Sequence, residues 1–280
     1  MSTVKYYDWS YHQARTRPNK VAVKEVSTGR ETTYGQLEER SCRLASWLQN
    51  KGVKKGDRVA ILIHNCTEVF ELEFACAKIG AIELPLNWRL TKPELEYILN
   101  DSSPEVLIYG SNFADTAKAL TKDCSIKNSL EIDDEDQNNE YEQALKENID
   151  FDVVETTHDD LIMLMYTSGT TGHPKGAMIT HEMQFYNIVN LAGSSRVTDK
   201  TVQLIVLPLF HTGGMNCYAN PILHYGGQIV LMKEFDPGKA LEIIDDPDYG
   251  ITHFFAVPAP FQFMMQLSLI HISEPTRPIA

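Results

Sequence analysis

The chain has 280 residues, 43% of them hydrophobic, which is enough to bury a sizeable core and to form more than one subdomain. A formal net charge of −13 argues against a nucleic-acid partner or an anionic membrane, because both would favour a basic surface. Five cysteines at irregular spacings form neither a CxxC pair nor a zinc pattern, which is typical of reduced thiols in the cytosol.

The N-terminal segment, residues 1–20, lacks the apolar stretch of a signal peptide. No later apolar run approaches the length of a membrane-spanning helix. We therefore expect a cytoplasmic protein without an integral membrane segment.

Helices and strands alternate in the hydrophobic pattern of the first hundred residues. Thr33 and Gln36 form a capping-box pattern at the start of a helix that continues to Lys51. The pattern then predicts a buried strand over 57–63, an amphipathic helix opened by residues 65–68 and ended by Gly80, a strand over 82–86, a helix capped by Thr91 and Glu94, and a strand over 106–109. This order predicts an α/β fold of doubly wound, mostly parallel sheets with flanking helices.

An acidic, amide-rich stretch covers residues 131–160. Such a run is normally a solvated connector, and we interpret it as a surface linker. A metal-binding role is the alternative, but the spacing of the carboxylates matches no calcium loop.

A loop rich in glycine and hydroxyl side chains follows, with the sequence YTSGTTGHPKG over residues 166–176. Its glycines let backbone N–H groups turn toward an anion, its hydroxyls donate hydrogen bonds, and its lysine brings a mobile positive charge. The residues are Thr167, Ser168, Gly169, Thr170, Thr171, Gly172, Pro174, Lys175 and Gly176. Apolar runs on both sides predict that the loop joins two strands, and the composition predicts a site for a nucleoside triphosphate.

Two common phosphate motifs do not fit this loop. A Walker A motif needs glycine directly before its lysine, where Pro174 stands. A dinucleotide fingerprint needs G-x-G-x-x-G, but Thr170 and Thr171 separate the first two glycines. A plain surface linker is the remaining alternative, and an ordered pattern between two apolar strands argues against it.

After the loop, the alternation of helices and strands resumes. Thr180 is typical of a helix cap, and further strands are predicted over 204–208, 228–232 and 251–257, with a helix starting at Asp236 and Pro237. The first of these strands leads directly into Phe210 and His211, at the carboxyl end where open α/β sheets bind ligands. From the residues alone, a histidine there is more typically a hydrogen-bonded structural residue than a catalytic one.

The other histidines considered form no ligand cluster, since His64, His158, His224 and His253 are scattered singly without an HExxH motif. We therefore expect no catalytic transition metal. Magnesium would be carried in with the nucleotide.

The loop over 166–176 resembles, at every position, the signature loop of the acyl- and aryl-adenylating superfamily, which includes acyl-CoA synthetases, luciferases and the adenylation domains of peptide synthetases. LPLFHTGG, over 207–214, resembles the segment that supplies an aromatic–histidine pair to the carboxylate pocket. NWRLTKPELEYIL, over 87–99, is similar to the corresponding segment of fatty-acyl and medium-chain acyl-CoA synthetases.

The resemblance implies an AMP-forming acid–thiol ligase. Such an enzyme activates a carboxylic, here a fatty, acid with ATP as an acyl-adenylate and passes the acyl group to coenzyme A. By resemblance, the ATP-binding residues are Thr167, Ser168, Gly169, Thr170, Thr171, Gly172, Pro174, Lys175 and Gly176; the catalytic residues are Thr167, Lys175 and His211; the acyl pocket contains Phe210 and His211; and the Mg²⁺ ligand is Thr167. The partners would be the small-molecule acid, ATP and CoA, with no nucleic acid.

The last residues, 267–280, read LSLIHISEPTRPIA and resemble a translated sequencing adapter. We therefore expect residues 1–266 to be a partial N-terminal AMP-binding domain of such an enzyme, without the C-terminal lid domain and without a GYGxTE-like segment. On this interpretation the chain is catalytically incomplete. Two other interpretations remain: an amino-acid adenylation domain that serves a carrier protein, and a nucleotide-binding module without chemistry.

Overall fold

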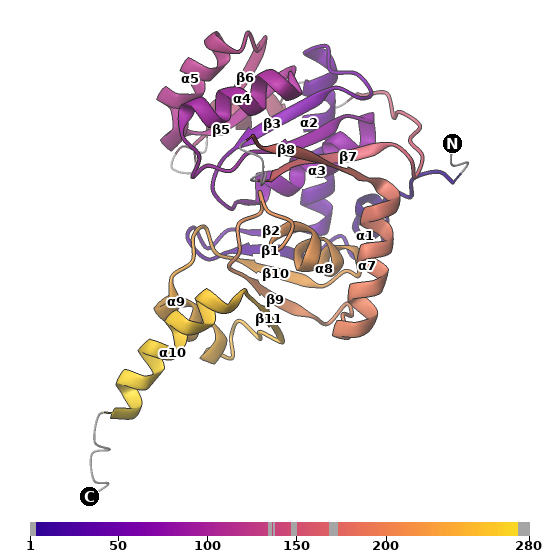
Figure 1. Cartoon of the computed structure of the whole chain (residues 1–280). Helices are drawn as coiled ribbons and strands as arrows, with labels where there is room; N and C mark the ends of the chain where they lie inside the picture. Colours follow the sequence, from indigo (N-terminus) through magenta and orange to yellow (C-terminus); the bar gives the residue numbers. More distant parts are fainter. Residues whose placement is uncertain (1–3, 134–135, 137, 147–149, 168–172, 274–280) are drawn as a thin grey trace, which may run out of the picture.

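A computed structural model describes residues 4–133, 136, 138–146, 150–167 and 173–273, with only the backbone described for residues 268–273 (Figure 1). The strands are β1 (Val21–Glu25), β2 (Glu31–Thr33), β3 (Arg58–Leu62), β4 (Ile82–Pro85), β5 (Val106–Gly110), β6 (Asn128–Ile132), β7 (Leu161–Thr167), β8 (Lys175–Thr180), β9 (Val202–Ile205), β10 (Gln228–Leu231) and β11 (His253–Phe255). The α-helices are α1 (Trp9–Thr16), α2 (Tyr34–Asn50), α3 (Thr67–Ile79), α4 (Lys92–Ser102), α5 (Ala114–Asp123), α6 (Glu140–Lys146), α7 (His181–Ser195), α8 (Asn220–His224), α9 (Pro237–Asp245) and α10 (Pro258–Ser273). A 3-10 turn, η1 (Ser111–Phe113), precedes α5, and a π-helical turn, η2 (Met215–Ala219), precedes α8.

Two sheets form the framework. The six-stranded sheet has the order β6-β5-β3-β4-β7-β8 and is parallel except for β8, which runs antiparallel to β7. The five-stranded sheet has the order β11-β9-β10-β1-β2 and is parallel except for the β1–β2 hairpin. The predicted fold class, an α/β protein with mostly parallel sheets and flanking helices, is confirmed.

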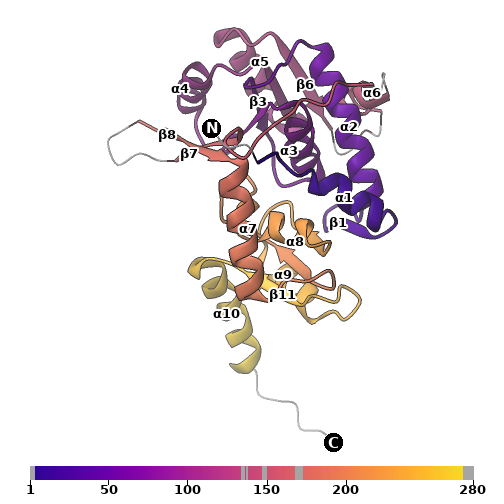
Figure 2. The ribbon, with the colours of Figure 1, turned by 90° about the vertical axis from the view of Figure 1, so that its right-hand side faces the viewer.

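The layers follow from which face of each strand is apolar. Helices α4 and α5 cover one face of the six-stranded sheet, while α2 and α3 pack between its other face and the five-stranded sheet. Helices α9 and α10 cover the far face of the five-stranded sheet. Along β10, Ile229 and Leu231 point into the middle layer and Val230 points toward α9, as the two-residue repeat of a strand requires. Figures 1 and 2 show this stacking from two sides.

Helix α3 lies at the centre of the molecule and is buried at all 13 positions, including its glutamates and its lysine. The sequence predicted an amphipathic helix with one solvated face, and that prediction is wrong. The physical reason is that sheets lie on both sides of the helix, so its polar side chains are paired rather than hydrated. Lys78, for example, donates to Asp8 and to Glu38 at 2.7 Å each.

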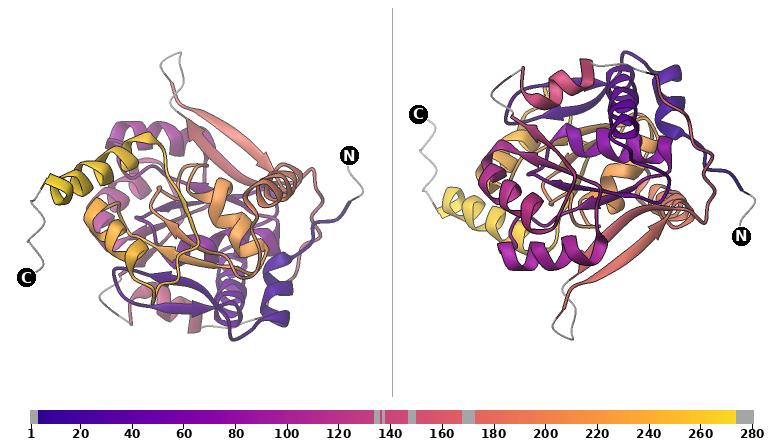
Figure 3. Two further views of the ribbon diagram at one scale, coloured as in Figure 1. Left: turned by 90° about the horizontal axis from the view of Figure 1, so that it is seen from below. Right: turned by 90° about the horizontal axis from the view of Figure 1, so that it is seen from above.

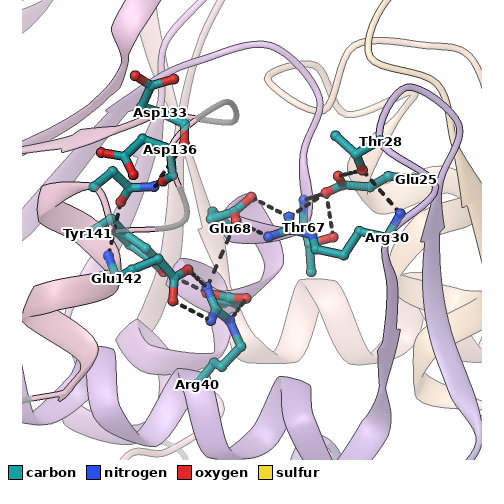
Figure 4. Close-up of polar contacts among 12 residues, drawn as sticks. Glu25, Thr28, Arg30, Arg40, Thr67, Glu68, Asp133, Asp136, Tyr141 and Glu142 are labelled. Atoms are coloured by element: carbon teal, nitrogen blue, oxygen red, sulfur yellow. Dashed lines mark hydrogen bonds and ion pairs between the residues drawn. The ribbon is translucent and has the colours of Figure 1, made fainter.

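The acidic stretch is also more structured than a surface linker. It contributes the end of β6 and helix α6, whose Tyr141 is buried and donates to Glu71 of α3 at 2.7 Å. Arg40 of α2 donates to Glu71 at 2.5 Å. It also donates to Glu142 at 2.6 Å (Figure 4). The stretch is therefore tied to the middle layer by buried polar contacts that a charge pattern cannot reveal.

Helix ends agree closely with the sequence predictions. Capping boxes form between Thr33 and Gln36 and between Thr91 and Glu94, and Gly80 ends α3 in the left-handed conformation with φ of 68°. The predicted domain boundary at residue 266 falls within α10, and residues 274–280 of the predicted adapter-like tail lie outside the described residues.

Candidate active site

The signature loop lies at the tip of a hairpin formed by β7 and β8. This confirms that the loop joins two strands, and the hairpin extends away from the rest of the sheet (Figures 2 and 3). Thr167 ends β7 and Lys175 begins β8, and the two residues are paired across the hairpin. The intervening Ser168, Gly169, Thr170, Thr171 and Gly172 lie outside the described residues. The predicted roles of these five in binding ATP therefore stay predictions.

The two paired residues at the base of the loop are both exposed. In the described part of the chain, no carboxylate forms an ion pair with Lys175, so its ammonium group is available to an anion. Thr167 is an exposed hydroxyl-bearing residue on the same end of the hairpin. A single hydroxyl suits a magnesium ion whose other ligands come from phosphates and water.

Gly176, the next residue of β8, is paired with Tyr166. A Cβ atom built on Gly176 would lie 2.8 Å from Cδ1 of Leu164 and 3.3 Å from the Tyr166 ring. From the sequence we expect this glycine to help the loop turn its N–H groups toward an anion. Gly176 lies within a strand, where an added Cβ would have to displace the side chain of Leu164 on β7, and its role in binding ATP stays a prediction.

Helix α4 supports the hairpin from one side. The hydroxyl of Tyr166 donates to the carboxylate of Asp101. Burial and the hydrogen bond to Asp101 raise the pKa of Tyr166, which therefore stays protonated at neutral pH. His173 stacks on Tyr97 with ring centroids 4.9 Å apart and planes 21° apart. These contacts fix where the loop leaves the sheet.

The second predicted group, Phe210 and His211, lies in the loop that follows β9. His211 is exposed, and its Nδ1 accepts a hydrogen bond from the N–H of Gly213 at 3.0 Å. Because Nδ1 is the acceptor, the neutral ring carries its proton on Nε2, which points the donor away from this turn. No ring contact or hydrogen bond between described residues links this group to Thr167 or Lys175.

Asn65 fixes the start of this loop. Its amide nitrogen donates to the carbonyls of Leu207 at 3.0 Å and Met232 at 3.1 Å, and its amide oxygen accepts from the N–H of Leu209 at 2.9 Å. Asn65 follows β3 of one sheet, whereas its partners follow β9 and β10 of the other. A single buried amide thus joins the carboxyl ends of strands from both sheets.

Gly214 closes the same loop. A Cβ atom there would lie 2.3 Å from the carbonyl oxygen of Pro208, so no other residue fits without moving the backbone. The second glycine of the LPLFHTGG segment is therefore explained by close backbone approach.

Sequence reasoning missed an exposed arginine beside Phe210. The guanidinium carbon of Arg89 lies 4.7 Å from the ring centroid of Trp88 and 5.9 Å from that of Phe210, and the two rings pack edge to face. Across the described ranges, Arg89 forms no ion pair. Its guanidinium group contacts aromatic rings only, so it can still pair with an anion. Arg89 belongs to the segment over 87–99. What marks it as a candidate site residue is its proximity to Phe210, and that proximity is visible only in the folded structure.

The described residues contain neither a candidate metal cluster nor a candidate membrane span. Among the residues with described positions, no group of three or more His, Cys, Asp or Glu side chains could hold a metal ion. In that same part of the chain, no helix combines the length and apolar character needed to cross a membrane.

The fold and the hairpin together define a class: an α/β protein of two mostly parallel sheets in which a Ser/Thr/Gly-rich segment joins the strands of a hairpin. The profile of the AMP-binding enzyme family matches residues 10–275, and the chain belongs to that family.

Relatives in this family include acid–CoA ligases. The chain is 37% identical over 254 residues to the feruloyl-CoA synthase of an Amycolatopsis species, covering 91% of this chain and 49% of the relative. It is 34% identical over 265 residues to the long-chain-fatty-acid–CoA ligase FadD13 of Mycobacterium tuberculosis, covering 94% of this chain and 52% of the relative. The chain thus spans about half the length of the curated relatives it matches.

A solved structure gives the same result for the fold. The inhibitor-bound N-terminal domain of FACL13 from Mycobacterium tuberculosis matches with a TM-score of 0.85 and 32% identity, over 94% of this chain and 65% of that domain. The two-sheet arrangement described above is therefore that of an N-terminal domain in this family.

Proposed function

We propose that the full-length protein activates a carboxylic acid with ATP and then transfers the acyl group to coenzyme A. The observation that carries the proposal is the exposed Lys175 opposite Thr167 on the β7–β8 hairpin, inside the region that matches the AMP-binding family. Among the described residues, no carboxylate pairs with Lys175. The relatives named as CoA ligases support the reaction class. The similarity of residues 87–99 to fatty-acyl ligases favours a fatty acid as substrate.

In the first step, a carboxylate oxygen bonds to the α-phosphorus of ATP while the bond to the bridging oxygen breaks. Pyrophosphate leaves with the electron pair, so negative charge builds on the leaving group. Lys175 would compensate that charge, and the hydroxyl and N–H groups of the loop would orient the β- and γ-phosphates. Magnesium bound with the nucleotide neutralises phosphate charge, and Thr167 would hold it on the protein side.

In the second step, the sulfur of coenzyme A attacks the acyl carbon, its thiol proton passes to solvent, and AMP leaves. Phe210 and His211 would line the space for the acid, with the Nε2–H of His211 as a donor to the carboxylate oxygen. The turn between Pro208 and Gly214 supports this role, because hydrogen bonds from the N–H groups of His211 and Gly213 lie within it and position the two side chains.

The test is pyrophosphate release by a full-length version with ATP and fatty acids of several chain lengths. Lys175→Ala is expected to slow release about 100-fold or more, as is usual when one charge-stabilising group is lost. Lys118→Ala is the matched control, because Lys118 is exposed on α5. Unchanged release by Lys175→Ala would contradict the proposal, and acid-dependent release without acyl-CoA formation would overturn the second step.

Two narrower proposals accompany this one. The 280-residue chain by itself is expected to release no pyrophosphate, because it spans about half of its relatives, and a malachite-green assay on this chain tests that point.

We also place the protein in the cytoplasm, since Cys42, Cys66, Cys76, Cys124 and Cys217 are all free thiols and the substrates are intracellular.

A further inference from the structure

Helix α4 presents two side chains to the β7–β8 hairpin. Tyr97 and Asp101 lie four residues apart, so they share one face of the helix. The carboxylate of Asp101 accepts a hydrogen bond from the hydroxyl of Tyr166, and the Tyr97 ring stacks on that of His173 with centroids 4.9 Å apart. One face of α4 therefore contacts the chain on both sides of residues 168–172.

The two contacted residues stand beside the candidate site residues of the hairpin. Tyr166 directly precedes Thr167, and His173 stands two residues before Lys175. Thr167 and Lys175 are both exposed, so burial of their own side chains does not hold them in place. Because the two are paired across the hairpin, a movement of either strand would displace both. Their position thus depends on the contacts that their neighbours make.

Apolar packing supports the hairpin only up to Tyr166. Leu164 and Tyr166 of β7 pack against the buried cluster that includes Leu95 and Leu99 of α4. Among the described residues between Tyr166 and Ala177, none belongs to a buried apolar cluster. The hydrogen bond to Asp101 and the ring stack on Tyr97 therefore hold the end of the hairpin that carries Thr167 and Lys175.

The location of Asp101 is not explained by the stability of its own helix. It lies in the last turn of α4, where the helix dipole disfavours a negative charge. In the described chain its carboxylate forms no ion pair with a lysine or arginine, and the Tyr166 hydroxyl is its partner. We propose that Asp101 and Tyr97 are positioning residues that hold Thr167 and Lys175 where the phosphates of ATP bind. This assignment rests on the proposed function.

The first test is hydrogen exchange of the backbone amides of residues 175–180 in the 280-residue protein, followed by mass spectrometry. Asp101→Ala, at an exposed position, is expected to speed exchange about threefold, because the hairpin end opens more often. Tyr97→Ala should act in the same direction. Asp123→Ala is the matched control, since Asp123 pairs with Lys92 of the same helix at 2.7 Å but does not contact the hairpin. Unchanged exchange in Asp101→Ala, or equal acceleration by the control, would overturn the positioning role.

The second test is steady-state kinetics of a full-length version. Asp101→Ala should lower kcat/KM for ATP about fivefold through loss of one charge-assisted hydrogen bond, with the KM of the acid unchanged. Tyr166→Phe removes the same hydrogen bond from the other side and should have the same effect. The double variant should lose no more than either single variant, because only one interaction is lost. Additive losses, or an equal effect on ATP and the acid, would contradict the proposal.

Failure of this proposal can be told apart from failure of the proposed function. If Lys175→Ala slows pyrophosphate release but Asp101→Ala does not change the kinetics, the positioning role is overturned and the activity stands. If Lys175→Ala has no effect, the proposed function is contradicted, whereas hydrogen exchange decides by itself whether α4 holds the hairpin.

Discussion

The carboxyl group of Glu83 on β4 is buried close enough to that of Glu73 on α3 for the two to interact electrostatically. Glu83 is 0% and Glu73 1% exposed, and in the described structure neither oxygen of Glu83 has a hydrogen-bond partner. Burial, and then the charge of Glu73, raise the pKa of Glu83 well above its ordinary value. Burial raises the pKa of Glu73 to about 7, against the opposing hydrogen bonds from Gln184 and Asn220. Glu83 is thus protonated at neutral pH.

This pair predicts a specific dependence of stability on pH. Both folded-state pKa values lie above the unfolded one, so the native state holds extra protons, and the stability they provide is complete below about pH 4.5 and is lost as pH rises through 7. Glu83→Gln mimics the protonated form. Relative to the parent, its free energy of unfolding should rise by roughly 1–3 kcal/mol between pH 5 and pH 8, as measured by urea denaturation. Glu182→Gln, exposed on α7, is the control, and a pH-independent difference for Glu83→Gln would contradict the prediction.

The network around Arg40 predicts a large loss of stability on truncation. Arg40→Met leaves the fully buried carboxylate of Glu71 without its guanidinium partner and also releases Glu142. We expect a loss of about 3–5 kcal/mol, because an unpaired buried charge remains. Lys239→Met breaks an exposed pair with Glu242, which solvent screens, and should leave the melting temperature nearly unchanged. Equal effects of the two substitutions on the melting temperature would show that the buried network is not stabilising.

Two glycine-to-alanine substitutions should change the free energy of unfolding in opposite directions. Gly214→Ala places a methyl group 2.3 Å from the Pro208 carbonyl oxygen and should destabilise the protein by about 3 kcal/mol or more. Gly193→Ala, in α7 with nothing within 4 Å of the new atom, should stabilise it by roughly 0.5–1 kcal/mol. Thermal unfolding of both variants checks this, and a neutral Gly214→Ala would mean that the turn after β9 can relax.

Arg89 is expected to bind an anionic substrate. In a full-length version, Arg89→Ala should raise the KM of one substrate among the acid, ATP and CoA about tenfold, because a charge-assisted hydrogen bond is lost. Arg15→Ala is a matched control, since Arg15 is exposed and also lies over an aromatic ring, 5.7 Å from that of Tyr11. If all three KM values are unchanged in Arg89→Ala, the guanidinium serves packing alone.

Local signals in the sequence predicted much of the fold. Caps such as Thr33 with Gln36, glycines such as Gly80, and apolar runs such as β3 depend on neighbouring residues only, and these predictions are confirmed. The burial of α3 on all sides could not be predicted, because its second covering sheet is formed by strands far away in the chain. The acidic stretch was misjudged for the same reason, since its partner Arg40 lies about a hundred residues earlier.

The candidate site likewise contains residues that the sequence predicted and residues that it did not. The hairpin that carries Lys175 was predicted, because the loop and its flanking strands are contiguous. Asn65, Arg89 and Asp101 were missed, since each acts on a segment that is distant in sequence. Contacts of this kind become visible only when the two sheets are assembled.

The five-stranded sheet pairs strands that are far apart in the sequence, since Val23 of β1 pairs with Ile229 of β10. All strands of the six-stranded sheet lie between these two residues in the sequence. On a ribosome that adds 5–20 residues per second, β1 would wait on the order of 10–40 s for its partner strand. During that interval the β1–β2 hairpin has an unpaired edge, and the central helices lack one of their covers. Nascent chains of this protein are thus expected to engage chaperones until the second sheet closes.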